Sequence, residues 1–437
     1  MSETILVTGA TGYIASRLIP RLLQAGYQVR CMARQPGRLA GRTWFPLVEM
    51  VSADVTLPAT LPSALLGVSA AFYLIHNMSA GHGYHALDIE SARNFGLAAR
   101  QAGVEHIIYL GGLADEQEPG LNLHMQSRIE CGEALREAGV AVTEFRAGVI
   151  VGPGSVSFEM IRFLAEQFPL ILGPTWLRNH SQPVAISNVL DYLIAALTTP
   201  AARGMVIQIG TQASFTYIEL ILLYARIRGL QRLPVLLPFV PVSMMVYLID
   251  LLTPVERSYA TPLVHGLKND SLVLDRSPLF YFPGIKILDF ESAVRHALEA
   301  THPARVERIW LDLDQEQVEV RHEGMLIDYR RLWLSAPAQS VFSDLLKLLS
   351  GAWRPGWQAQ FRPDYQTSDT LRYKSIQKLP GEAWLEWHLT PRVGGTLLEQ
   401  TTFYKPKGLP GFLRWFWLKP FYRRVFDQLI RRLELPV

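Results

Sequence analysis

The sequence predicts an α/β protein in which a doubly wound parallel sheet is followed by a smaller α+β domain with an antiparallel sheet. Three observations support this prediction. Short apolar runs alternate with helical patterns from residue 4 to residue 146, a glycine-rich turn follows the first run, and hydrophobic alternation of period two begins near residue 305. We therefore expect the parallel sheet in 1–155, the rest of the same unit in 156–300 and the antiparallel domain in 301–437.

Bulk properties narrow the functional class. The 437 residues exceed one ordinary core, and a net charge of +3 over that length argues against nucleic-acid binding. The two cysteines, Cys31 and Cys131, give neither a disulfide framework nor a zinc pattern. No signal peptide precedes the first strand, so we expect a cytoplasmic protein.

The first apolar run is followed directly by a glycine-rich turn, and together they read T-I-L-V-T-G-A-T-G-Y-I-A at Thr4 to Ala15. Gly9 supplies a sharp turn, Gly12 lets the backbone approach a pyrophosphate, and the next helix points its N–H groups at that anion. The third glycine of such fingerprints is replaced by Ala15. The turn residues we expect to contact a dinucleotide are Thr8, Gly9, Thr11, Gly12, Tyr13 and Ile14.

The end of the second strand, at 28–33, predicts which dinucleotide binds. Enzymes that use NAD place an acidic residue there, whereas those that use NADP place an arginine near the 2′-phosphate. This chain has Arg34, with Arg38 close behind, and no acid. NADP(H) is therefore favoured over NAD(H), and the alternative is that Arg34 is a solvated charge.

Two further strand ends should meet the cofactor at the carboxyl edge of the sheet. A strand at 47–53 delivers Asp54 and Val55 to the adenine, although Asp54 is equally suited to capping the following turn. A strand at 70–75 delivers Ile75 and His76 to the nicotinamide. Because His76, His82 and His85 lie on a loop without a thiolate or paired carboxylates, we expect no metal there.

Four stretches resemble the short-chain dehydrogenase/reductase superfamily, and more narrowly its atypical NAD(P)H-binding branch. They are Thr8–Ala15, Y-L-I-H-N-M at 73–78, I-Y-L-G-G-L at 108–113 and R-A-G-V-I-V-G-P-G at 146–154. The resemblance implies a Rossmann fold in 1–155, with Gly111 at the cofactor, and a substrate side in 156–300.

The chain differs from that family at the positions of the catalytic residues. Catalytic members end the fifth strand in Ser and carry Tyr-x-x-x-Lys on the next helix, expected here at 123–138. This chain has Gly111 and Gly112, then His124-Met-Gln-Ser-Arg128. A histidine titrates near neutrality, so His124 is suited to protonating an alkoxide or enolate, with Arg128 holding ribose or phosphate oxygens and His76 near the hydride. The alternative is a binding protein that has lost its chemistry.

The segment 233–252 is nearly long enough to span a bilayer, but three prolines and Asp250 interrupt it. We expect a buried or surface-docked helix there, and peripheral membrane contact is the alternative.

The last third of the chain is rich in tryptophan. Antiparallel strands are expected at 306–313, 317–321, 324–334, 371–376, 383–389 and 396–404, with helices at 338–349 and 411–433. This segment resembles the helix-grip, START-like fold through P-G-E-A-W-L-E-W, K-G-L-P-G-F-L and the final helix. The resemblance implies a cavity for a hydrophobic ligand, for which the candidate lining residues are Trp353, Trp357, Trp384 and Trp387. Alternatively, the tryptophans fill a small core.

The final helix is basic and aromatic. This pattern suits binding to an anionic membrane surface or to a partner, and it also suits a helix with one face buried in its own domain.

Together these features predict an NADP(H)-dependent oxidoreductase that acts on a lipophilic carbonyl, enone or quinone. The competing hypothesis is a non-catalytic nucleotide sensor or accessory protein that binds a hydrophobic ligand or a membrane partner.

Overall fold

The computed structural model describes residues 3–76, 83–116, 120–252, 255, 257–312, 315–349 and 360–434. Its internal contacts divide the chain into two units. Unit 1 comprises 1–164, 170–227 and 232–298, and unit 2 comprises 165–169, 228–231 and 299–437.

Unit 1 is built on a seven-stranded parallel sheet in the order β11-β6-β5-β4-β1-β2-β3, which confirms the predicted doubly wound fold. The strands are β1 (Thr4–Val7), β2 (Gln28–Ala33), β3 (Glu49–Ser52), β4 (Ala70–Tyr73), β5 (His106–Gly112), β6 (Ala141–Ala147) and β11 (Val206–Ile209). The last of these, β11, pairs with β6 along four residues and forms one edge of the sheet.

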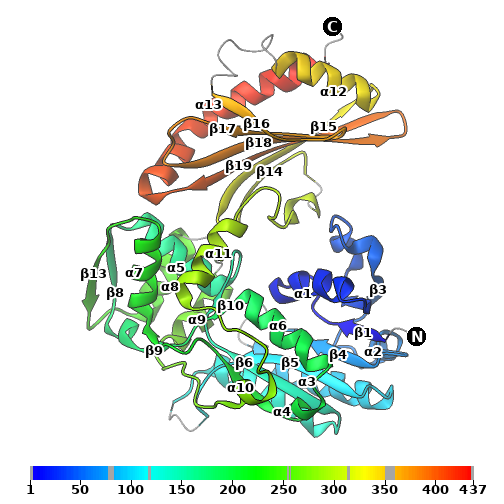
Figure 1. Cartoon of the computed structure of the whole chain (residues 1–437), viewed down its shortest axis with the longest axis vertical. Coiled ribbons are helices and arrows are strands. Elements are labelled where there is room, and N and C mark those ends of the chain that lie inside the picture. The colour runs from blue at the N-terminus through cyan, green and yellow to red at the C-terminus, as the bar shows by residue number, and fades with distance from the viewer. Residues whose placement is uncertain are drawn as a thin grey trace. The chain divides into compact units, whose positions relative to one another are not determined.

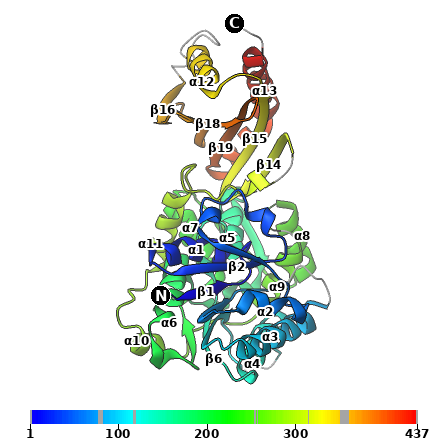
Figure 2. The same ribbon diagram turned by 90° about the vertical axis from the view of Figure 1, so that its right-hand side faces the viewer.

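Helices cover both faces of this sheet (Figures 1 and 2). They are α1 (Tyr13–Gln24), α2 (Leu61–Leu65), α3 (Tyr84–Gln101), α4 (Leu123–Glu137) and α6 (Ile186–Leu197). Because side chains alternate along a strand, Ile5 and Val7 pack with α1 and α6, while Leu6 packs with α2, α3 and α4. Strands buried on both faces explain the uninterrupted apolar runs in the sequence.

The remainder of unit 1 stands beyond the carboxyl edge of the sheet and consists of helices and strand pairs. The helices are α5 (Val156–Gln167), α7 (Tyr217–Ile227), α8 (Val242–Leu252), α9 (Arg257–Gly266), α10 (Ser277–Tyr281) and α11 (Phe290–Ala300). The paired strands are β7 (Ile150–Val151) with β10 (Val184–Ala185), β9 (His180–Ser181) with β12 (Phe215–Thr216), and β8 (Leu170–Pro174) with β13 (Leu233–Leu237).

The apolar segment 233–252 is not one helix, so that prediction was wrong in its first part. Residues 233–237 form β13, which pairs with β8, and the helix α8 begins at Val242 after Pro238 and Pro241. Proline lacks the N–H that a helix interior needs, which explains the late start. Among the described helices none has the length and apolarity needed to cross a membrane.

Unit 2 is the predicted antiparallel domain, with strand order β14-β15-β19-β18-β17-β16. Its elements are β14 (Gln317–His322), β15 (Met325–Leu334), α12 (Ala338–Lys347), β16 (Phe361–Gln366), β17 (Thr370–Ser375), β18 (Gly381–Arg392), β19 (Gly395–Pro406) and α13 (Gly408–Glu434). Both helices lie over one face of the sheet, as Figure 1 shows. On α13, Lys419 and Arg423 both pair with Glu319 of β14.

Three tryptophans of unit 2, Trp310, Trp384 and Trp387, are fully buried in its core, whereas Trp333 and Trp417 are exposed. Trp384 and Trp387 lie three residues apart on β18, so they face opposite sides of the sheet, and both are fully buried. Residues 309–312 form a 3-10 turn in place of the strand expected at 306–313, because Trp310 packs under the sheet against Phe403. Trp353 and Trp357 lie outside the described residues.

Candidate active site

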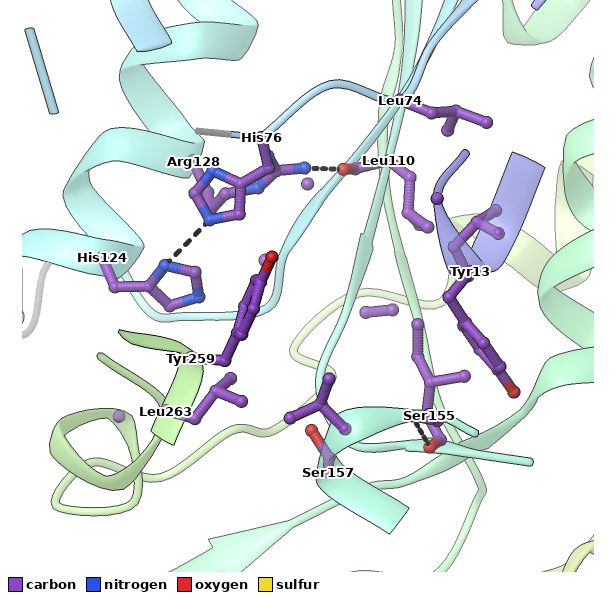
Figure 3. Close-up of a pocket in the computed structure, with 18 of the residues that line it drawn as sticks. Tyr13, Leu74, His76, Leu110, His124, Arg128, Ser155, Ser157, Tyr259 and Leu263 are labelled. Atoms are coloured by element: carbon purple, nitrogen blue, oxygen red, sulfur yellow. Dashed lines mark hydrogen bonds between the residues drawn. The ribbon is translucent and has the colours of Figure 1, made fainter. Parts of the chain in front are cut away.

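One cavity of about 1160 Å³ in unit 1 joins the glycine-rich turn to an apolar chamber (Figure 3). Its first half is formed by the turn before α1 and by the ends of β2, β4 and β5. Its second half is lined by apolar side chains of α5, α7, α8 and α9, among them Met160, Ile221, Met245 and Leu263. Polar groups of α4 stand between the two halves.

The glycine-rich turn has the geometry that its sequence predicts. Gly9 has a φ of +62°, and a Cβ there would lie 2.9 Å from the carbonyl oxygen of Leu74. A Cβ on Gly12 would lie 3.0 Å from the carbonyl oxygen of Gly9. Since Gly12 caps α1 without a side chain, the positive end of the helix faces the cavity. The methyl group of Ala15 packs in the core.

Most residues predicted to contact the cofactor line this half of the cavity. They are Gly9, Thr11, Gly12, Tyr13, Ile14, Arg34, Asp54, Val55, Ile75, His76 and Gly111. Thr8 is the exception, because its hydroxyl donates to the carbonyl of Phe72 and accepts from the N–H of Leu74. Thr8 therefore joins β1 to β4 and does not reach the cavity.

Asp54 has a structural task as well. Its Oδ1 accepts hydrogen bonds from the backbone N–H and the hydroxyl of Thr56, at 2.9 and 2.8 Å. This is the turn-capping role that the sequence left open beside adenine recognition. Arg34 and Arg38 are exposed at the cavity rim, where a phosphate on the adenosine ribose would lie.

Two histidines from different elements meet at the centre of the cavity. His76 follows β4, and its Nε2 lies 3.2 Å from Nδ1 of His124 on α4. The other ring nitrogen of His76, Nδ1, lies 2.7 Å from Oδ2 of Asp88 on α3. The same carboxylate oxygen accepts the hydroxyl of Ser127 at 3.0 Å. Figure 3 shows the second ring nitrogen of His124 directed away from His76.

Both histidines are held neutral at pH 7. Burial, followed by the charges of His76 and Arg128, lowers the pKa of His124 to about 3. Burial and Arg128 also lower the pKa of His76, while Asp88 acts in the opposite direction. The expectation that His124 titrates near neutrality was therefore wrong, because the sequence does not show that its side chain is buried.

This burial predicts acid sensitivity. In the unfolded chain a histidine takes up a proton below about pH 6.5, whereas folded His124 resists protonation down to about pH 3. Stability is therefore lost as the pH falls below 6.5. For this one group the loss between pH 7 and pH 5 is about 2 kcal/mol.

Urea denaturation at the two pH values tests this prediction. The variant His124→Gln should lose less stability on acidification than the wild type, and replacement of the exposed His296 by Gln should leave the loss unchanged. Equal losses in the wild type and in His124→Gln would contradict a buried neutral imidazole at this position.

Arg128 lies one helical turn after His124 and is buried beneath the end of β5. One of its terminal nitrogens, Nη2, donates to the carbonyl of Leu110, and its guanidinium lies 4.9 Å from the ring centre of Tyr109. The other, Nη1, is buried and has no hydrogen-bond partner among the described residues. A cation that lines a cavity with an unused donor is suited to an oxygen of a ligand.

The two glycines at the end of β5 make room for this arrangement. A Cβ on Gly112 would lie 2.8 Å from the sulfur of Met125, and one on Gly111 would lie 3.1 Å from a carboxylate oxygen of Glu144. A serine at Gly111, as in catalytic short-chain dehydrogenases, would crowd that carboxylate. The departure from the family pattern therefore matches the local packing.

Sequence reasoning missed Asp88 and Tyr259. Asp88 shares the buried stripe of α3 with Ala92 and Phe95, and a charged residue on an apolar stripe is a signal that was available. Tyr259 lines the cavity from α9, and no motif marks it. The helix α9 packs against α4, and Figure 3 shows the Tyr259 hydroxyl on the side of the two histidines.

The histidines considered for a metal do not converge in the described residues. His76 is engaged by Asp88, His85 lies 3.2 Å from Glu130, and His82 falls outside the described range. In unit 2, ligand atoms of Glu307, His322 and Glu323 lie within 4.8 Å of one another.

Comparison with known proteins agrees with this architecture. Residues 1–158 match the NmrA-like family. The chain is 26% identical to ceramide reductase of Caulobacter vibrioides over 231 residues, which is 52% of this chain and 70% of that protein. Over 231 residues it is also 23% identical to the photosystem II assembly factor Ycf39 of Cyanophora paradoxa, again 52% of this chain and 69% of that protein.

Among solved structures, the triphenylmethane reductase of Citrobacter sp., complexed with NADP(H), superposes with a TM-score of 0.54 at 18% identity. The match covers 68% of this chain and 99% of that one. It shows that the two chains share the Rossmann fold, and the part of the sequence that resembles the NmrA-like family, residues 1–158, contains strands β1 to β7 of this chain.

Proposed function

We propose that the chain is an NAD(P)H-dependent reductase of a lipophilic carbonyl, enone or quinone, with NADPH as the preferred cofactor. The observation that carries this proposal is the continuity of the cavity, which runs from a dinucleotide-binding turn past His124 and Arg128 into an apolar chamber. The names of two similar proteins, a ceramide reductase and a triphenylmethane reductase, support the same reaction class.

The residues present fit a nicotinamide dinucleotide. Added Cβ atoms on Gly9 and Gly12 would crowd the turn, and the helix α1 directs its positive end at the space beyond it. The unused donor of Arg128 would hold a ribose or carbonyl oxygen. When bound, the reduced nicotinamide supplies a hydride.

In this site His124 exchanges the proton and Arg128 stabilises negative charge on the substrate oxygen. The chamber binds the apolar part of the substrate and excludes water from the reacting atoms.

Steady NADPH oxidation, measured with a panel of quinones, lipophilic enones and long-chain ketones, tests the proposal. Tight NADPH binding without turnover on any acceptor would contradict it.

Such a negative result would favour the second candidate, a non-catalytic NADP(H)-binding accessory protein. The similarity to Ycf39, named as an assembly factor, and the missing Ser and Tyr-x-x-x-Lys support this candidate. This second candidate would bind a hydrophobic ligand in a START-like second domain, or contact a membrane peripherally through 233–252 or α13.

The cofactor preference has its own test. Replacing Arg34 by Ala should weaken NADPH binding by about 10-fold to 100-fold, since a charged hydrogen bond contributes roughly 1.5–3 kcal/mol. NADH lacks the 2′-phosphate, so its dissociation constant should change less than about 2-fold by the same reasoning. Titration of the full chain with each nucleotide measures both constants. Equal weakening of the two would remove Arg34 from phosphate recognition.

A further inference from the structure

The three side chains Asp88, His76 and His124 form a continuous hydrogen-bonded line that ends at the cavity. The two links measure 2.7 and 3.2 Å, and they join α3, the end of β4 and α4. The side chain of Asp88 is only 2% exposed and that of His76 is 16% exposed, so water does not compete freely for these bonds. Residues from three elements thus meet in one polar chain inside an apolar unit.

Elementary hydrogen-bond chemistry fixes the direction of this line. An ionised carboxylate has acceptors only, so Asp88 requires a proton on Nδ1 of His76. A neutral imidazole then has a bare Nε2, which must accept from Nδ1 of His124. His124, neutral in turn, presents a bare Nε2 to the cavity.

We propose that Asp88 is a positioning residue that fixes both histidines as their Nδ1–H tautomers, so that the line works as a proton relay between the protein and the substrate oxygen. In its resting form the relay holds two ring protons, one on Nδ1 of His76 and one on Nδ1 of His124. The atom that faces the cavity, Nε2 of His124, is then a proton acceptor. With a third proton, His76 carries protons on both nitrogens beside Asp88, and Nε2 of His124 becomes a donor.

The relay gives a balanced account of the reduction, and here the inference rests on the proposed function. A bound, reduced nicotinamide would supply the hydride for the new C–H bond, and the carbonyl π electrons would move to the oxygen. The Nε2–H bond of His124 breaks as the O–H bond of the product forms. Nδ1 of His124 then takes the Nε2 proton of His76, and solvent restores the third proton.

The residues packed around the relay determine which of its groups take up a proton as the pH falls. Its neighbours are Asp88 and Tyr84 on α3, Arg128 on α4, Tyr259 on α9, and Tyr73 and Tyr109 on the sheet. Burial raises the pKa of Tyr73 and of Tyr109 well above 10, so both stay neutral. Uptake of the third proton therefore falls to the two histidines. We expect reduction to slow, and the reverse oxidation of an alcohol to accelerate, as the pH rises.

The tautomers can be observed without any substrate. Two-dimensional ¹⁵N–¹H NMR of the full chain with ¹⁵N-labelled histidine should show both His76 and His124 with the proton on Nδ1 at pH 7.5. An Nε2–H tautomer at either residue would overturn the inference, even if the protein is a reductase. The expected tautomers in a protein that reduces nothing would support the relay geometry and refute the proposed function.

The variant Asp88→Asn tests the positioning role. An amide offers a donor as well as an acceptor, so the single tautomer of His76 should give way to a mixture. The kcat for reduction should fall about 10-fold to 100-fold, the lower part of the range for proton-transfer groups, and its pH profile should move to lower pH. The KM for NADPH should stay within about 2-fold, since Asp88 acts through His76.

Two companion variants complete this test. Glu90→Gln changes an exposed carboxylate on the same helix and should leave the NMR signals and the pH profile unchanged. If Asp88→Asn does not fold, His76→Gln removes the middle of the line and should likewise lower kcat and release the Nδ1–H tautomer of His124. An unchanged tautomer and pH profile in the folded Asp88 variant would overturn the proposal.

Discussion

Replacing His124 by Ala should lower the kcat for reduction by about 100-fold to 10,000-fold, the usual contribution of a positioned proton-transfer group. NADPH should bind within about 2-fold of the wild-type affinity, because the proposed binding contacts, the glycine-rich turn and the rim arginines, are unchanged. Steady-state kinetics with the best lipophilic acceptor and fluorescence titration with NADPH measure the two effects separately.

The matched control is His85→Ala. His85, near the start of α3, pairs with Glu130 of α4 and does not line the cavity. Its loss should leave kcat unchanged. If His124→Ala retains wild-type turnover, the proton comes from another group, and Tyr259, which lines the same cavity, is the next candidate.

Narrowing the apolar chamber should have the second large effect. Leu263 lies on α9 and faces the cavity (Figure 3), and Trp at this position would occupy space that a long alkyl chain needs. Each buried CH₂ contributes about 0.8 kcal/mol, so excluding four of them should raise the KM for a long-chain substrate about 200-fold. A short-chain analogue should be affected by less than about 3-fold on the same argument.

The comparison of substrates distinguishes a blocked chamber from a damaged fold. Leu279→Trp, at an exposed position of α10 outside the cavity, should leave both substrates unaffected. A loss of activity in Leu263→Trp that is equal for short and long substrates would show that the apolar chain binds elsewhere.

Local sequence patterns predicted the strands, the glycine-rich turn and the helix that surround this site, because each of these elements is specified by residues close together in the sequence. The glycine spacing, the apolar runs and the helix that carries His124 and Arg128 all follow from periodicity within about 15 residues. The strand ends that bring Ile75, His76 and Gly111 to the cavity follow from the parallel topology.

What the sequence did not predict depends on tertiary contacts. His76 and His124 are 48 residues apart, and Asp88 carries no motif, so their alignment appears only when α3, β4 and α4 are packed together. The low pKa of His124 has the same origin, because burial is a property of the fold. The apolar chamber combines helices from Met160 to Leu263, and β13 needs its partner β8 to be recognised as a strand.

We propose that a nicotinamide dinucleotide lies across the carboxyl edge of the sheet with its reactive ring beside His124. A crystal structure of the chain with NADPH tests this placement. We expect the pyrophosphate at the backbone of Gly12 and Tyr13, the 2′-phosphate beside Arg34 and the nicotinamide between Gly111 and His124. A complex in which the nucleotide lies outside this cavity, or in which the nicotinamide points away from His124, would contradict it.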